Sequence, residues 1–377
     1  MSSRGLLRRG DATAHLKVDL LIQGIRVTPA GMEAVAACKP GLRTRSGVSG
    51  GIDLVLPGDI HVNCTYTEAY ARSSPYLLDC DSIGMRILRE GVEVARPDLV
   101  PRPAWYSLQT TDGTPMVHIG QQCSADRLCI GMTLHCAFWR RDLRCRYCSI
   151  GANVSREARA KTIWSITEVI AAAVSDPVLP ARHVLVGGGT PVGSDRGAHF
   201  AAEICAAIKR EHDVSIYVMI LPPTDFDDLA RLHDAGADEL GMNVELFSQK
   251  ALLDYAPGKA RLIGHVHYYR ALEHAVRLFG PVRTRSIAIT GLEPVEETIR
   301  GAAFVASLGV MPILSPFRPL DGSDLSGHVG LSAAEHLALH DSVATACAPL
   351  EMVPGPTCIA CQNNTLAFPS GDPYRFY

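Results

Sequence analysis

The stretch LCIGMTLHCAFWRRDLRCRYCSIG, residues 128–151, decides the fold. Its first part, Leu128 to Leu134, is a short apolar run with few breakers, long enough for a buried parallel strand. The loop that follows contains Cys136, Cys145 and Cys148, with eight and then two residues between them. Because a loop can fold back on itself, these thiols can converge on one metal centre. Four thiolates close a structural zinc site, whereas three leave one coordination position open for a substrate or cofactor.

Around this stretch, strand-like apolar runs alternate with helix-like segments. Six strands that alternate with helices imply right-handed βαβ units and a parallel sheet. The expected fold class is therefore α/β, either a partial (β/α) barrel or an open doubly wound sheet. In both folds the site lies at the carboxyl ends of the strands. We expect strands at residues 128–134, 182–186, 214–220, 239–246, 283–289 and 310–314, and helices at 165–174, 196–211, 225–234, 261–279, 295–308 and 333–346.

The pattern of apolar runs and breakers divides the chain into three parts. We expect an N-terminal α+β domain at residues 1–122, which caps the rest, and the barrel at residues 123–325. Residues 326–377 are expected to form a C-terminal helix and a Cys-x2-Cys extension. Within the first part we expect strands at 52–56 and 60–62 and a helix at 82–89.

Composition excludes several classes of function. The chain has 47% apolar and 20% charged residues and a net charge of −3. This charge balance does not indicate a protein that binds nucleic acid or a membrane surface. Met1 to Gly10 is Arg-rich but is not followed by the apolar core of a secretory signal. We therefore expect a cytoplasmic protein, in which the twelve cysteines are thiols and metal ligands rather than disulfides.

Glycines and polar side chains stand at the expected strand ends. The second strand ends in a bare-backbone turn that lets amides approach a ligand closely, or is simply a tight βα turn that needs glycine. The fourth strand has Asn243 and Glu245 on one face, which is costly inside an apolar barrel unless they bind something polar. The turn consists of Gly187, Gly188, Gly189 and Thr190.

Two further charged residues follow the fifth and sixth strands. Glu293 can hydrogen-bond a ligand, and Arg318 is a cation that can meet a carboxylate. We take both as candidate catalytic residues acting on a small polar substrate.

The C-terminal stretch GPTCIACQNNT, residues 355–365, is the second informative site. Cys358 and Cys361 have ligand spacing, but two thiols make half a site. They could ligate an auxiliary cluster or zinc with help from Cys347, Cys123 or Cys129. Alternatively, Cys358 could be a catalytic thiol that donates a hydrogen atom, or the pair could be a structural closure of the barrel.

Five motifs together resemble the radical S-adenosylmethionine (SAM) superfamily, most closely its biotin-synthase-like branch. They are the cysteine loop, the GGGT turn, the NVE strand, the ITGLEP strand end and the LSPFRPL strand, and they span residues 123–323. The family's usual motif is CxxxCxxC with an aromatic residue before the last cysteine. Here Tyr147 and the last two cysteines match, but the first spacer is longer. We take Cys136 as the first ligand and Cys129 as its alternative. More faintly, the chain resembles a subgroup encoded beside nitrilases in bacterial gene clusters.

The resemblance implies a partial (β/α)6 TIM-like barrel and two cofactors, a [4Fe-4S] cluster and SAM. The enzyme would cleave SAM reductively and abstract hydrogen from its substrate. A flavodoxin- or ferredoxin-type electron donor could dock at the basic residues around the cysteine loop. The resemblance assigns Cys136, Cys145 and Cys148 to three irons, Tyr147 to the adenine, Gly187 to Gly189 to the methionine amino group, Asn243 and Glu245 to the ribose, and the backbone of Ile313 or Leu314 to the adenine edge.

A different class of function stays open from the residues alone. Cys145-x2-Cys148 and Cys358-x2-Cys361 could form one four-cysteine structural zinc site in a binding or hydrolytic barrel protein.

Overall fold

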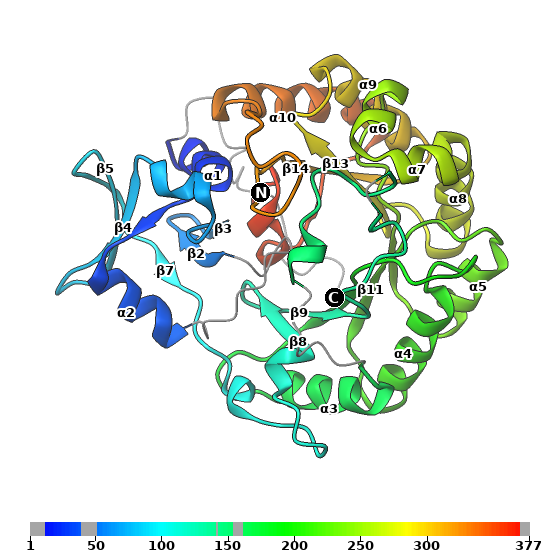
Figure 1. Ribbon diagram of the computed structural model, residues 1–377, viewed down its shortest axis with the longest axis horizontal. Coiled ribbons are helices and arrows are strands. Elements are labelled where there is room, and N and C mark those ends of the chain that lie inside the picture. Colours follow the sequence, from blue (N-terminus) through cyan, green and yellow to red (C-terminus); the bar gives the residue numbers. More distant parts are fainter. Residues whose placement is uncertain (1–11, 39–50, 141, 154–160, 370–377) are drawn as a thin grey trace, which may run out of the picture.

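A single sheet of seven strands, ordered β14-β13-β12-β11-β10-β9-β8, organises the molecule. The computed structural model describes residues 12–38, 51–140, 142–153 and 161–369, so the Met1 to Gly10 segment lies outside the described residues. The sheet curls around a centre, helices cover its outer face, and the N-terminal part lies beside its open side (Figure 1). Among the described helices, none has the length and apolar character needed to cross a membrane.

The six predicted strands are present and parallel, which confirms the partial (β/α)6 barrel. The fourth is shorter than the expected 239–246, because β12 ends at Gly241 and Asn243 and Glu245 lie beyond it. Their central residues are apolar and buried because helices cover one face and the barrel interior the other. The sheet has a seventh strand that we did not predict, β8, which pairs with β9 in antiparallel fashion and overlaps the predicted domain boundary at residue 122. The strands are β8 (Gly120–Cys123), β9 (Arg127–Gly131), β10 (His183–Gly187), β11 (Ser215–Met219), β12 (Glu239–Gly241), β13 (Thr284–Thr290) and β14 (Met311–Pro316).

The helices follow the expected alternation. The segment expected at 261–279 is present as α8, and two short helices that we did not predict, α6 and α7, precede it. The main hydrophobic core lies between the strands and these helices. The helices are α3 (Ile163–Val174), α4 (Ala198–Glu211), α5 (Asp227–Asp234), α6 (Gln249–Tyr255), α7 (Pro257–Leu262), α8 (Gly264–Phe279), α9 (Val295–Ser307) and α10 (Ala333–Cys347).

The N-terminal part contains two small sheets, ordered β1-β4-β5-β6 and β3-β2-β7, and has its own core. The strands expected at 52–56 and 60–62 are present as β2 and β3. The helix expected at 82–89 is wrong, because this segment is the hairpin strand β5. The elements are α1 (Ala12–Gln23), β1 (Arg26–Val27), α2 (Pro29–Cys38), β2 (Ile52–Leu56), β3 (Ile60–Cys64), β4 (Tyr76–Cys80), β5 (Met85–Arg89), β6 (Val92–Ala95) and β7 (Asp98–Leu99).

The C-terminal extension after α10 runs along the outer edge of β14. The Gly355 N–H donates to the Pro312 carbonyl at 2.9 Å, and the Leu366 N–H donates to the Leu314 carbonyl at 2.8 Å. These bonds cover an edge that would otherwise present unpaired backbone groups. On the far side of the extension, the buried Lys17 of α1 donates to the Ala367 carbonyl at 2.5 Å. The extension therefore lies between the barrel and the N-terminal part.

Candidate active site

The cysteine loop, residues 132–153, connects β9 to the segment before α3 and is held on two sides. On one side the Ala137 N–H donates to the Thr190 carbonyl at 2.7 Å. On the other side, the Gly258 N–H donates to the Leu143 carbonyl at 2.9 Å, so the α6–α7 junction supports the loop. Both contacts lie at the carboxyl ends of the barrel strands, where the sequence predicts the site.

An open cavity of about 820 Å³ lies under this loop. Cys136, Cys145 and Cys148 all line it, which brings the three predicted thiols to one space. Other predicted residues line the same cavity, namely Tyr147, Gly188, Gly189, Thr190, Asn243 and Glu245.

The glycines after β10 allow the cysteine loop to approach the strand end. A side chain at Gly189 would collide with the His135 carbonyl, next to Cys136. Gly188 has a φ of +126°, and a Cβ there would lie 2.7 Å from the Thr133 carbonyl. The Gly189 N–H donates to that same carbonyl at 2.8 Å. The turn therefore needs glycine chiefly because another backbone lies against it.

Glu245 is the centre of a polar network on the cavity wall. Its carboxylate accepts hydrogen bonds from the Tyr147 hydroxyl and, at 2.6 Å, from the ammonium group of Lys259. Its φ is +68°, which is uncommon for a residue with a side chain and marks a position held by its surroundings. Asn243 is fixed as well, since its Oδ1 accepts from the Ile287 N–H at 3.1 Å. Both side chains are thus oriented by bonds within the protein.

Lys259 is a site residue that we did not predict. Burial alone would lower its pKa, but Glu245, Tyr268 and Cys145 act in the opposite direction, so that the pKa of Lys259 is raised overall. It therefore stays protonated and pairs with Glu245. No pattern in the sequence singled out Lys259, because its buried position in α7 is visible only in the structure.

Arg196 is a second residue that sequence patterns did not single out. It lines the cavity, lies over the Phe138 ring with its Cζ 5.7 Å from the ring centroid, and donates to the Leu262 carbonyl at 3.4 Å. Burial lowers the pKa of Arg196. In the described part of the chain, no carboxylate lies within ion-pair distance of it. Arg196 therefore offers the cavity a cation whose charge is not neutralised.

Several predicted residues lie outside the cavity lining. Gly187 is the last residue of β10, behind the turn. The Leu314 carbonyl accepts from the C-terminal extension, and Ile313 forms a β-bridge with Gly355. The extension therefore covers the edge of β14 at these two residues. The Glu293 carboxylate accepts from the N–H groups at the start of α6, with Ser248 at 2.8 Å. Glu293 thus stabilises a helix N-terminus.

Arg318 is buried on the side of β14 that meets the N-terminal part. Its charged and ionisable neighbours are Cys64, Glu68 and Tyr70, and burial lowers its pKa. No carboxylate of the described residues is within ion-pair distance of its guanidinium group. Arg318 does not line the cavity, although it follows a strand that ends beside it.

Cys358 and Cys361 lie at the opposite, amino end of the barrel. The Cys361 sulfur is 2.9 Å from Nε2 of His183, the first residue of β10. A strand of five residues separates that end from the cavity by roughly 15 Å. The alternative of one zinc site built from both Cys-x2-Cys pairs is therefore wrong, because the pairs lie at opposite ends of the same strands.

The sequence profile of the radical SAM superfamily matches residues 142–300, a range that contains Cys145, Cys148, the glycine turn and Glu245. Residues 142–300 therefore form a radical SAM domain. Radical SAM proteins are enzymes that use a [4Fe-4S] cluster and SAM, and these two are the cofactors of this chain. Such enzymes generally need an electron donor. The biotin-synthase-like branch and the nitrilase-associated subgroup stay predictions.

Comparisons with known proteins show one related sequence and similar solved structures. The bacteriochlorophyllide c C-7(1)-hydroxylase of Chlorobaculum limnaeum is 25% identical to this radical SAM chain over 344 residues, which are 86% of this chain and 81% of the relative. Among solved structures, methylornithine synthase aligns with a TM-score of 0.50 at 15% identity, over 69% of this chain and 77% of that one. The FeFe-hydrogenase maturase HydG from Carboxydothermus hydrogenoformans aligns with a TM-score of 0.47 at 16% identity, over 62% and 55% of the two chains. The structural likeness to methylornithine synthase concerns the fold.

The residues at the cavity fit a three-cysteine iron-sulfur cluster. In the protein alone, burial raises the pKa of Cys145 to about 12 and that of Cys148 to about 11. Buried thiols of this kind become thiolates when a cation compensates the cost of desolvation, as iron does. The cavity beside them has room and polar groups for SAM.

Proposed function

We propose that this radical SAM enzyme holds its cluster through Cys136, Cys145 and Cys148 and acts on a small carboxylate-bearing substrate. The observation that supports this most is that the three thiols line one cavity together with Asn243 and Glu245. When bound, the cluster supplies the electron that cleaves SAM into methionine and a 5′-deoxyadenosyl radical, which abstracts hydrogen from the substrate.

The cavity residues orient SAM in this proposal. Arg196 binds the carboxylate of the methionine part, because it is the cavity's cation without a carboxylate partner in the described structure. Glu245 accepts from a ribose hydroxyl, and Lys259 holds that carboxylate in place through their contact at 2.6 Å. Tyr147, whose hydroxyl bonds Glu245, packs beside the adenine.

Arg318 anchors the substrate carboxylate. Its buried guanidinium group has Glu68 as a charged neighbour but no ion-pair partner among the described residues, and a bound carboxylate would pair with it. A single buried guanidinium group suits a small polar substrate. We therefore propose a smaller substrate than the bacteriochlorophyllide named for the relative.

The electron donor is a flavodoxin- or ferredoxin-type protein that docks beside the cysteine loop. Arg140 and Arg146 are exposed there and offer positive charge to an acidic partner. A cytoplasmic location fits the twelve cysteines, which all lie in the described part and are free thiols.

The first experiment tests the cluster ligands by iron content and 5′-deoxyadenosine formation after anaerobic reconstitution. We expect Cys136→Ala, Cys145→Ala and Cys148→Ala each to lose about four irons and SAM cleavage. Cys205→Ala, in the buried face of α4, is the control and should keep both. Retention of iron and cleavage by Cys136→Ala would transfer the first ligand to Cys129.

A second experiment tests the SAM carboxylate contact. Arg196→Gln removes a charged hydrogen bond of about 2 kcal/mol, so we expect SAM affinity to fall roughly 30-fold. Arg140→Gln, an exposed neighbour of the loop, should leave the affinity unchanged. Equal SAM affinities for Arg196→Gln and wild type in equilibrium dialysis would refute the assignment.

A third experiment tests the substrate class. Small carboxylates that carry deuterium on carbon are offered to the reduced enzyme, and deuterium in 5′-deoxyadenosine is measured by mass spectrometry. We expect transfer from at least one carboxylate in wild type and its loss in Arg318→Gln. Transfer that occurs only from uncharged compounds, or equally in the variant, would exclude this role of Arg318.

A further inference from the structure

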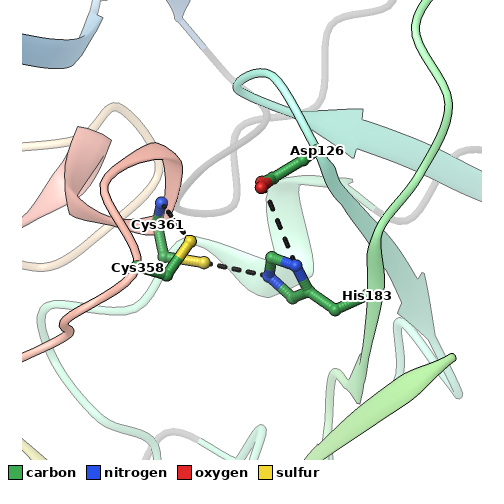
Figure 2. A group of neighbouring side chains, drawn as sticks. All are labelled: Asp126, His183, Cys358 and Cys361. Carbon is green, nitrogen blue, oxygen red and sulfur yellow. Dashed lines mark hydrogen bonds and ion pairs between the residues drawn. The ribbon is translucent and has the colours of Figure 1, made fainter. Parts of the chain in front are cut away.

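Four side chains able to bind a metal ion lie close together (Figure 2). They lie at the amino end of the barrel, and none of them lines the SAM cavity. Asp126 comes from the turn between β8 and β9, His183 begins β10, and Cys358 and Cys361 belong to the C-terminal extension. One ligand atom from each lies within 4.8 Å of the other three, and all four side chains are buried. Three segments far apart in sequence therefore bring a carboxylate, an imidazole and two thiols to one point.

The contacts within the group leave a carboxylate oxygen unsatisfied. His183 lies between the others, with Nε2 2.9 Å from the Cys361 sulfur and Nδ1 3.9 Å from Oδ1 of Asp126 (Figure 2). This Oδ1 is buried and has no hydrogen-bond partner. The Cys361 N–H donates to the Cys358 sulfur at 3.4 Å. A buried carboxylate oxygen without a donor is costly, and a cation beside it removes that cost.

The surrounding charges suit one divalent cation. Arg285 forms an ion pair with Glu239 in the same end of the barrel, and Arg127 lies close enough to Cys361 to interact with it. When both thiols are protonated, the positive charges of the two arginines balance the negative charges of Asp126 and Glu239. One divalent ion that replaces two thiol protons leaves the net charge of this buried layer unchanged.

The position does not suit a reactive thiol. Cys358 and Cys361 are 4% and 3% exposed, and neither lines the SAM cavity. A hydrogen-donating thiol must touch the substrate, whereas roughly 15 Å of strand β10 separates the pair from the cavity. The predicted helpers Cys347, Cys123 and Cys129 do not belong to the group, and Asp126 and His183 take their place.

We propose that Asp126, His183, Cys358 and Cys361 bind one structural Zn²⁺ ion. Two sulfurs, one nitrogen and one oxygen form a closed tetrahedral donor set of the kind that zinc prefers. Ligand atoms around zinc are roughly 3.3–3.8 Å apart, so small side-chain movements bring the group to this geometry. The ion fastens the C-terminal extension to the amino end of the barrel, and this role is independent of the function proposed for the cavity.

The test measures zinc and iron in the full-length holoenzyme, isolated anaerobically without chelators from zinc-supplied cells. We expect about one zinc per chain, with X-ray absorption showing two sulfurs near 2.3 Å and two nitrogen or oxygen atoms near 2.0 Å. Cys358→Ser/Cys361→Ser should lose the zinc and keep the radical cluster iron. Cys205→Ser, the matched buried cysteine of α4, should keep both.

Asp126→Asn keeps the shape of the site in case the double variant fails to fold. We expect it to fold and to lose zinc to a competing chelator at roughly 10- to 100-fold lower chelator concentration than wild type. Conversely, Cys145→Ala/Cys148→Ala should lose iron and keep zinc, which separates this site from the active site. Wild-type protein without zinc, a disulfide between Cys358 and Cys361, or about four additional irons that depend on these cysteines would each overturn the proposal.

Discussion

At Gly189, the addition of a single Cβ atom would push the cysteine loop away from the end of β10. In Gly189→Ala the methyl group meets the His135 carbonyl, which is backbone and has little freedom to move aside. We expect the loop to shift and the reconstituted protein to hold well under half of the wild-type iron. Iron per chain after anaerobic reconstitution, with circular dichroism to verify the fold, measures this.

Gly131 is the matched control for that substitution. It lies at the end of β9, and the nearest atom to an added Cβ is 3.6 Å away, an ordinary contact. Gly131→Ala should therefore keep its iron. If Gly189→Ala also binds a full cluster and cleaves SAM at the wild-type rate, the close approach of the two backbones is not needed for cluster binding.

Lys259 and Glu245 form a buried ion pair whose two members can be removed separately. Lys259→Met leaves the Glu245 carboxylate without its cation, and we expect the free energy of unfolding to fall by about 3 kcal/mol. In Lys259→Met/Glu245→Gln the remaining partner is neutral, so part of this loss should return. Urea denaturation of the apo-proteins measures both changes, and additive losses in the double variant would show that the pair is not coupled.

At this scale the sequence predicted residues on strand ends better than those on helices. Asn243 and Glu245 were predicted on the expectation that positions two apart in a strand share a face. Both line the cavity, but they follow the end of β12 and the φ of Glu245 is +68°, so the strand alternation itself does not place them. Lys259 and Arg196 were not, since a lysine in a helix or an arginine in a loop is usually solvated. Glu293 was misjudged for a similar reason, because sequence does not show that a carboxylate will meet the N–H groups of another element.

Among the elements, α1 contains the buried Lys17, whose amine lies 4.9 Å from the centroid of the Phe368 ring. Burial lowers the pKa of Lys17 from 10.5 to about 7. Between these two values the unfolded chain binds a proton that the folded protein does not, so Lys17 makes stability rise with pH over this window. We expect the rise from about pH 7 to about pH 9 to be smaller in Lys17→Met than in wild type.

Lys250→Met is the control for the pH experiment, because Lys250 is exposed and pairs with Asp254 on the surface. Its stability should follow that of wild type across the same range. Parallel curves for Lys17→Met and wild type, measured by urea unfolding at each pH, would mean that Lys17 keeps its proton in the folded protein.

The elements of the barrel were predictable because their strands are continuous apolar runs and each ends in a turn or a polar position. The hairpin strand β5 was not. Its segment SIGMRILR has the composition of a helix as well as of a strand, and pairing with β4 decides between them. The short strand β8 was missed because four residues carry too little pattern, and β9 supplies its hydrogen bonds.

In the molecule as a whole, Leu366 joins parts that are distant in sequence. It is fully buried in a cluster with Val18 of α1, Val343 of α10 and Leu314 of β14. Leu366→Ala should lower the free energy of unfolding by about 3 kcal/mol and make the C-terminal extension sensitive to protease. Leu350→Ala, at a half-exposed position, should do neither. Unchanged unfolding of Leu366→Ala would mean that the extension contributes little to the fold.

The global arrangement was predictable only in part. The cysteine loop, the glycine turn and Asn243 meet because carboxyl ends of parallel strands share one edge. The return of Cys358 and Cys361 to the other end was not predictable, since no periodicity describes the path of a chain after its last helix. The division at residues 122 and 325 stays a proposal.

The bonds that the extension makes also set an order in time. Asn363 meets Arg127 across 236 positions of sequence, and Ala367 meets Lys17 across 350. On the ribosome, β9 and α1 emerge long before residues 355–369, so neither contact can form until the extension has left the exit tunnel. Until then the edge of β14 is uncovered, and an unpaired strand edge is a place where a nascent chain can aggregate or bind a chaperone.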